Sequence, residues 1–110
     1  MTITVPGTLA IRNNAGQLPA FYPAVEEWSG FTLTVGTAPT GSQISVDVYL
    51  ATSPPTLQFT LAIAAGTLSV SATPAQVAAA VSVPANTNVY LNITAVGSSF
   101  PGADLTAKAF

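Results

Sequence analysis

Apolar and polar residues alternate along several short segments of this chain. In residues 44–50 every second residue is aliphatic, and the residues between them are Ser45, Asp47 and Tyr49. Residues 89–97 begin with the same pattern, in which Val, Leu and Ile alternate with Tyr, Asn and Thr. Because successive side chains of a β-strand point to opposite faces of the sheet, both segments are predicted to be strands with one buried face.

Turn-forming residues such as Pro, Gly and Asn separate these segments. They recur roughly every 8 to 12 residues, which is the spacing typical of all-β sandwiches and barrels. Further extended segments with alternating residues are expected at residues 3–5, 9–12, 31–35, 57–63 and 103–110. Together the segments predict an all-β, antiparallel fold of about eight strands. The whole chain, residues 1–110, is expected to form one domain.

One stretch of the sequence favours a helix. Thr73 is suited to cap a helix, Pro74 suits the first helical position, and Gln76 completes a capping box. A short helical turn is therefore expected near residues 74–81. The alternative is a strand through residues 77–83, which the β-branched valines of this segment and the all-β context favour.

The buried side chains are expected to be those that share the apolar face of each strand. They are Phe31, Leu33, Val35, Ile44, Val46, Val48, Phe59, Leu61, Val89, Leu91, Ile93 and Leu105. A chain of 110 residues is long enough to enclose one hydrophobic core without disulfides or a structural metal ion. The absence of cysteine from the sequence agrees with this interpretation.

The chain carries few charges for a domain that folds in water. Charged residues make up 5% of the sequence, against roughly 25% in typical soluble domains. No charged residue lies between Asp47 and Asp104. Because a monomer normally uses surface charge to stay in solution and to keep its sheet edges unpaired, partners are expected to cover much of this surface.

Two broad classes of partner conflict with the composition. The chain has two basic residues and a formal net charge of −2, so it is poorly suited to neutralise a nucleic-acid backbone. Prolines interrupt the apolar segments, which leaves no apolar run of the roughly 18 residues that a membrane-spanning helix requires. We therefore expect neither nucleic acid nor a membrane as a partner.

The residue types that most often carry out catalysis are scarce. The sequence has no histidine and no cysteine, so Ser–His and Cys–His nucleophiles are unavailable. Glu26 and Glu27 are the one adjacent pair of carboxylates. Neighbouring residues of a strand point to opposite faces, so these two cannot act together on one bond. The chain is not expected to be an enzyme or to require a cofactor.

Two aspartates are candidate metal ligands. Asp47 and Asp104 could share a calcium ion with carbonyl oxygens, because calcium accepts mixed oxygen ligands. Two aspartates far apart in the sequence are a weak basis for a site, and no metal is expected. Asp104 is expected instead to accept hydrogen bonds in the turn formed by residues 101–103. Asp47 is expected on a strand face that is hydrated or lies between subunits.

Four aromatic residues are candidates for a sugar-stacking platform. They are Tyr22, Trp28, Tyr49 and Tyr90. Aromatic rings offer a large, rigid apolar face with a polar edge, which suits the apolar face of a sugar. Packing in a core or an interface is the commoner use of such residues, and it is the role expected for these four.

Four segments, in this order, resemble a β-sandwich module that is widespread in structural proteins of tailed bacteriophages. They are residues 41–50, 63–66, 89–97 and 101–106, with the sequences GSQISVDVYL, IAAG, VYLNITAVG and PGADLT. The module occurs in tail-fibre, baseplate and capsid-decoration proteins. The resemblance extends over residues 41–110 and implies a jelly-roll-like β-sandwich, commonly trimeric, that forms part of a virion.

The resemblance and the length of the chain together favour a capsid cement or decoration protein on the capsid surface of a virion. Such a protein would form a homotrimer and clamp neighbouring subunits of the phage major capsid protein. The alternative is a small tail, baseplate or head-fibre component that binds host-surface carbohydrate. A third hypothesis is a lectin-like or carbohydrate-active β-sandwich module.

Residues 1–6 are expected to form an extended N-terminal arm outside the sandwich. Within it Thr2, Ile3, Thr4 and Val5 alternate between β-prone polar and apolar residues. Such a segment can add as a strand to the exposed sheet edge of a neighbouring subunit. These four residues are therefore the predicted partner interface, and their removal is expected to leave the sandwich folded.

Overall fold

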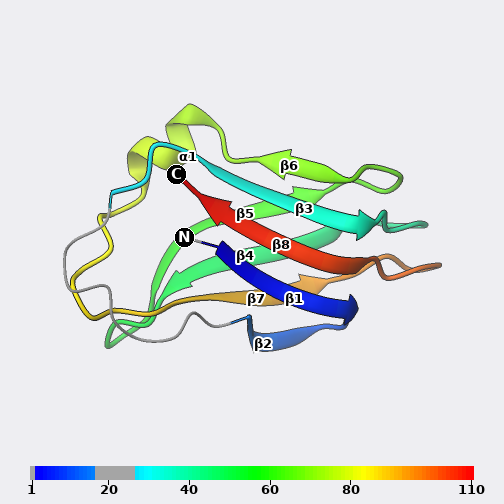
Figure 1. Cartoon of the computed structure of the whole chain (residues 1–110), viewed down its shortest axis with the longest axis horizontal. Coiled ribbons are helices and arrows are strands. Elements are labelled where there is room, and N and C mark those ends of the chain that lie inside the picture. Colours follow the sequence, from blue (N-terminus) through cyan, green and yellow to red (C-terminus); the bar gives the residue numbers. More distant parts are fainter. Residues whose placement is uncertain (1, 17–26) are drawn as a thin grey trace.

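The computed structural model describes residues 2–16 and 27–110. In chain order the elements are β1 (Thr2–Thr8), β2 (Arg12–Ala15), β3 (Phe31–Thr37), β4 (Ile44–Leu50), β5 (Thr56–Ile63), β6 (Ser69–Ser71), α1 (Pro74–Ala79), β7 (Val89–Ala95) and β8 (Ala103–Ala109). The strands form two antiparallel sheets that face each other (Figure 1). Sheet A has the order β1-β8-β3-β6, and sheet B has the order β2-β7-β4-β5.

The predicted all-β sandwich of eight strands is confirmed. Its last two strands, β7 and β8, belong to different sheets, so the Pro-Gly turn between them carries the chain from sheet B to sheet A. A bridge between Thr40 and Phe100 joins this connection to the loop that leads from β3 into β4. These two crossings between the sheets, from β3 to β4 and from β7 to β8, are thereby tied together at one end of the sandwich.

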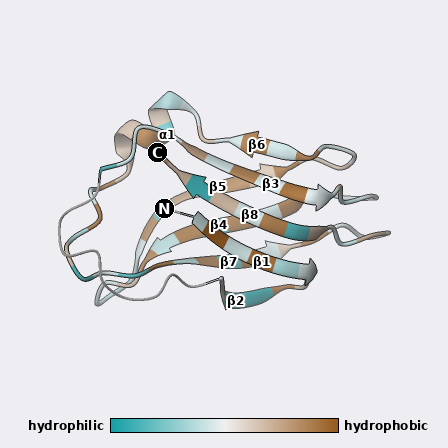
Figure 2. Ribbon diagram, viewed as in Figure 1, coloured by the Kyte–Doolittle hydropathy of each residue, from teal (hydrophilic) through white to brown (hydrophobic). Residues whose placement is uncertain are grey.

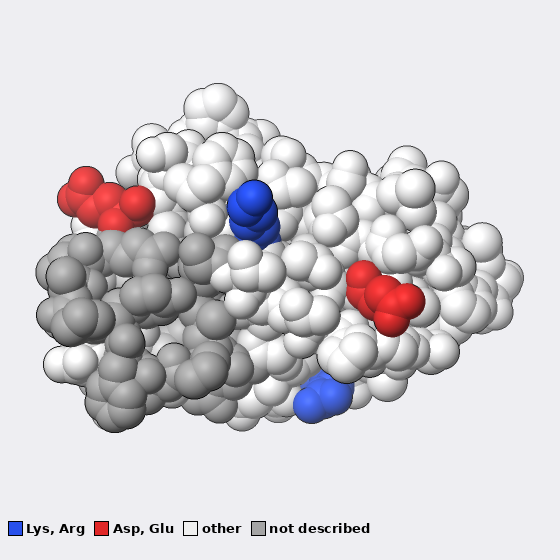
Figure 3. Space-filling model, in the orientation of Figure 1, with Lys and Arg blue, Asp and Glu red and all other residues white. Residues whose placement is uncertain are grey.

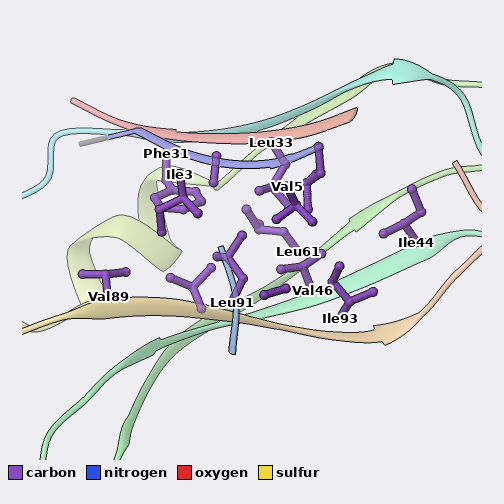
Figure 4. Close-up of a cluster of buried hydrophobic side chains, with 14 of the residues drawn as sticks. Ile3, Val5, Phe31, Leu33, Ile44, Val46, Leu61, Val89, Leu91 and Ile93 are labelled. Carbon is purple, nitrogen blue, oxygen red and sulfur yellow. The ribbon is translucent and has the colours of Figure 1, made fainter. Parts of the chain in front are cut away.

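The core lies between the sheets and is built from alternate residues of their strands. Along each ribbon, hydrophobic and hydrophilic residues alternate (Figure 2). The labelled side chains Ile3, Val5 and Leu33 of sheet A point toward Val46 and Leu91 of sheet B (Figure 4). Every residue predicted for the core is buried. The alternation of apolar residues is therefore sufficient to identify the inward face of most strands.

The first strand corrects the expectation of an extended arm over residues 1–6. From Thr2 onward this segment is β1, an edge strand that pairs antiparallel with β8. Ile3 and Val5 lie opposite Ala107 and Leu105, and their side chains are only 3% and 6% exposed. The strand that receives β1 lies at the other end of the sequence, so local alternation alone could not distinguish a free arm from an edge strand.

A bulge lets β1 continue past its Pro-Gly pair. The register of β1 against β8 shifts between Val5 and Thr8. Gly7 adopts φ 81°, a conformation that favours glycine. Its N–H donates to the Oδ1 of Asp104 at 2.8 Å. The carboxylate of Asp104 therefore accepts a hydrogen bond from β1, which corrects the expectation that its donors come from the turn at residues 101–103.

A second bulge places Leu57 on the outer face at the start of β5, although it alternates with Phe59 and Leu61 in the sequence. The register of β5 against β4 skips one residue, so that Leu57 lies opposite Tyr49 and Gln58 becomes the extra residue. Leu57 is 49% exposed, whereas Gln58 is 9% exposed. The Gln58 side chain donates to the carbonyl of Val81 at 2.7 Å and accepts from its N–H at 3.1 Å. These two hydrogen bonds compensate the burial of the amide.

The predicted helical turn is confirmed, and the alternative strand over residues 77–83 is wrong. Thr73 caps α1 through its hydroxyl, which accepts from the N–H of Gln76 at 3.1 Å. The Gln76 side chain accepts in turn from the N–H of Thr73 at 2.9 Å. The Gln76 amide also donates to the carbonyl of Thr60 at 3.2 Å, which holds the helix against β5.

Replacing Leu91 with Ala is expected to lower the free energy of unfolding by about 2–5 kcal/mol, because the side chain is fully buried and a cavity would remain. The same change at Leu68, which is 55% exposed, is the matched control and should cost about 0.5 kcal/mol or less. Denaturant unfolding followed by circular dichroism measures both values. Equal losses in the two variants would contradict this assignment of the core.

Replacing Ile3 with Ala should also cost about 2–5 kcal/mol of unfolding free energy, because Ile3 is buried against β8. Deleting residues 1–5 is expected to destabilise the sandwich further, since it removes both inward side chains of β1 and most of its ladder. Thr4→Ala, on the outer face of the same strand, is the control. Unchanged melting of the Ile3 variant would restore the interpretation of residues 1–6 as a free arm.

Candidate binding surfaces

The two aspartates considered as metal ligands are not brought together. Asp47 lies on β4 of sheet B, and Asp104 lies on β8 of sheet A. Asp47 accepts a hydrogen bond from the hydroxyl of Thr60 at 2.6 Å. Among residues 2–16 and 27–110, no group of three or more His, Cys, Asp or Glu side chains is placed to hold a metal ion. Within the same ranges, no helix has the length and apolar character to cross a membrane.

Glu27 lies beside a small hollow next to α1. Its Oε1 accepts a hydrogen bond from the hydroxyl of Ser82 at 3.1 Å. The hollow has a volume of about 200 Å³ and is also lined by Trp28, Val77 and Val81. Glu26 lies outside the described residues. Among the described residues that line the hollow, Glu27 is the one that is acidic.

The four aromatic residues do not form one described platform. Trp28 packs against Phe31 and Phe59, with ring centroids 5.3 and 6.0 Å apart, and thereby extends the core. Tyr49 and Tyr90 stack on each other, with centroids 5.4 Å apart and planes inclined by 10°. Tyr22 lies outside the described residues. The tyrosine pair and Trp28 consequently belong to different parts of the molecule.

The outer face of sheet B carries a row of large side chains that crosses three strands. Leu57 of β5 lies opposite Tyr49 of β4, which lies opposite Tyr90 of β7. We call these three residues the aromatic row. The next row is polar, with Asp47 opposite Asn92. Sheet B therefore presents an apolar row beside a polar one on the face that points away from the core.

The outer face of sheet A is different, because two of its rows consist almost entirely of side chains that end in a hydroxyl. Two rows cross all four strands in register. One row is Thr2, Lys108, Thr32 and Ser71, and the other is Thr4, Thr106, Thr34 and Ser69. We call these eight residues the hydroxyl face. Lys108 carries the one charge of the two rows, and charged groups are sparse on this side of the molecule (Figure 3).

A shallow groove lies on the hydroxyl face beside the last residue of the chain. It has a volume of about 450 Å³ and is lined by Thr32, Thr34, Thr106, Lys108 and Phe110. Phe110 is 64% exposed. The groove therefore combines an exposed aromatic ring, three hydroxyls and an ammonium group, and none of its lining residues is acidic.

Sequence reasoning missed this groove although the signal was present. The segments TIT, TLT, TAK and SVS each place two polar residues on the face opposite the core. Only the strand order β1-β8-β3-β6 aligns them into rows. That order joins segments from the two ends of the chain and from its middle, so it could not be inferred from any one segment.

Comparison with known proteins supports the fold alone. No family model matches the chain, and no curated protein matches it. Among solved structures the chain is similar to the globular domain of zebrafish complement 1qA protein, with a TM-score of 0.53. The two share 9% sequence identity, and the match covers 99% of this chain and 93% of that one. The similarity agrees with a jelly-roll-like sandwich and gives no support to a phage origin.

The stacked tyrosines are expected to be energetically coupled. In a double-mutant cycle, Tyr49→Ala and Tyr90→Ala should show a coupling free energy of about 0.5–1.5 kcal/mol, the range usual for aromatic pairs. Denaturant unfolding of the two single variants and the double variant provides the measurement. The pair Tyr49→Ala and Thr106→Ala, on opposite sheets, is the control and should be additive. Additivity of the tyrosine pair would mean that the stack contributes nothing beyond separate burial.

Proposed function

We propose that the chain is a non-enzymatic structural protein of a tailed-phage virion, in which it forms a homotrimer and acts as a capsid cement or decoration protein. The observation that carries the proposal is the scarcity of charge on a well-formed sandwich, with none between Asp47 and Asp104. A surface of this kind suits permanent contact with other proteins, because interface cores are depleted in charged residues. The phage-like order of strand and turn segments supports the virion setting.

The aromatic row on sheet B is the surface best suited to such contacts. Tyrosine is enriched at protein interfaces, where it combines a large apolar area with a hydroxyl. Tyr49 and Tyr90 already stack on each other, so their rings lose little further freedom when a partner covers them. Leu57 extends the same row with an exposed aliphatic side chain.

The predicted interface at Thr2, Ile3, Thr4 and Val5 stays a prediction. Only the strand backbone and the two threonine side chains remain candidates for contact with a partner. The side chains of Ile3 and Val5 are occupied in the core, so they are not available to a partner. Thr2 and Thr4 are exposed. In sheet A, β1 is an edge strand, so its backbone is the part suited to strand addition by a neighbouring subunit.

A trimer is expected in sedimentation equilibrium at micromolar concentration, with three times the mass of the 11.1 kDa chain. Replacing Leu57 with Glu should weaken the association, because it places a charge in the aromatic row. Leu68→Glu is the matched control, since Leu68 is similarly exposed, at 55%, but lies outside the row. A monodisperse wild-type monomer, or equal weakening by both changes, would contradict the proposed interface.

The capsid role is tested by mixing the protein with undecorated phage heads and, separately, with host cells or lipopolysaccharide. Binding to heads that raises their resistance to heat supports a cement protein. The Leu57→Glu variant should bind the heads less well than Leu68→Glu. Binding to cell-surface sugar without binding to heads would contradict the capsid role and favour the tail or head-fibre alternative.

A further inference from the structure

We propose that the groove on the hydroxyl face binds a saccharide that carries a carboxylate group. The groove is formed by Thr32, Thr34, Thr106, Lys108 and Phe110. It lies on sheet A, whereas the aromatic row proposed for protein contacts lies on sheet B. The inference therefore does not depend on the oligomeric state of the chain or on its place in a virion.

The exposed ring of Phe110 projects from an ordered backbone and lies against Gly30. The N–H groups of Ser29 and Gly30 donate to the Phe110 carbonyl, the latter at 2.8 Å, and the Phe110 N–H donates to the Gly30 carbonyl at 3.0 Å. The ring lies over Gly30, where an added Cβ would come within 2.5 Å of its Cζ. An aromatic ring that projects from an ordered backbone can stack on the apolar face of a sugar with little loss of backbone conformational entropy.

The hydroxyls beside the ring match the hydrogen-bonding character of a sugar. Each Thr hydroxyl can both donate and accept, as a sugar hydroxyl does. Neighbouring strands lie roughly 4.8 Å apart, and alternate residues of one strand about 7 Å apart. The threonines of the groove, which lie on neighbouring strands and at alternate positions, are spaced accordingly. Thr32 is bonded to the hydroxyl of Ser71 at 3.2 Å, which fixes it and leaves it hydrogen-bonding capacity for a ligand.

Lys108 gives the groove a preference for an anion. It is one of two basic residues in a chain whose formal net charge is −2. The described side-chain carboxylates have hydrogen-bond donors elsewhere: Asp104 has the N–H of Gly7, Asp47 has Thr60, and Glu27 has Ser82. A ligand carboxylate is thus the natural partner for the ammonium group, through a charge-assisted hydrogen bond.

The composition of the face argues against a second protein as its occupant. Interface cores are apolar and exclude water, whereas both rows of the hydroxyl face consist of hydroxyl side chains and Lys108. Phe110 is the one large apolar side chain that lines the groove. A single ring among hydroxyls is better matched to a sugar, which offers an apolar face edged by hydroxyl groups.

The test titrates the full chain with a galacturonic acid oligosaccharide, a galactose oligosaccharide of equal length, and inorganic phosphate, following backbone amide shifts by NMR. The acidic sugar should give saturable shifts centred on β3 and β8, and it should bind about tenfold or more tightly than the neutral sugar. Equal affinity for the two sugars, shifts elsewhere on the molecule, or no saturable binding would overturn the proposal. Displacement of the acidic sugar by equimolar phosphate would reduce the groove to a simple anion site and would also overturn it.

Two variants, each of which removes one positive charge, distinguish a specific contact at Lys108 from attraction by the net charge of the chain. Lys108→Gln should weaken binding of the acidic sugar about tenfold and leave the neutral sugar nearly unchanged. Arg12→Gln removes the same charge from β2 of sheet B and should leave both affinities unchanged. Equal weakening by the two variants would mean that net charge, and not the groove, attracts the ligand.

Two further variants, at different positions, test whether the ring of Phe110 contributes to sugar binding. Phe110→Ala should weaken binding of both sugars. Gly30→Ala should do the same by pushing the ring aside, because the new methyl meets the end of a movable side chain and not the backbone. Thermal melting of each variant checks that it is folded. Unchanged affinity in a folded variant of either kind would overturn the role assigned to Phe110.

Discussion

The contact between the inward faces of the two sheets is the interaction on which the rest of this structure depends. Leu33 and Leu105 of sheet A, and Val46 and Leu91 of sheet B, are completely buried in it. Burial of one aliphatic side chain contributes roughly 1.5–3 kcal/mol. With few charges and no disulfides to add stability, this packing has to offset most of the entropy lost on folding. The residues of the outer faces are consequently less constrained by core packing, and the two faces can differ in composition.

The alternation of residues was a reliable guide for strands whose own run of core residues is not interrupted by a bulge. It identified the inward faces of β3, β4, β7 and β8, and the helix followed from its capping residues alone. It does not extend to Leu57, because a bulge changes the face without changing the sequence pattern. It failed at Ile3 and Val5, whose burial depends on a strand about a hundred residues away.

The two outer faces show what strand order adds to local pattern. Each is made of exposed or partly exposed residues from strands that are separate in the sequence. Pairing in register turns Leu57, Tyr49 and Tyr90 into a continuous apolar row on one sheet, and turns scattered threonines into two hydroxyl rows on the other. The sequence therefore predicted the core well and the candidate sites poorly, because sites arise from neighbours that only the topology supplies.

The position of β8 has a consequence for how the chain is made. It is the inner strand between β1 and β3, yet the ribosome makes it after the other seven strands of the sandwich. Until it emerges, β1 and β3 have no common partner, and the apolar side chains of both remain uncovered. Sheet B, whose four strands precede it in the chain, can form earlier. An interrupted translation product that lacks residues 103–110 would thus be a half-sandwich with an open apolar face, a natural target for chaperones and proteases.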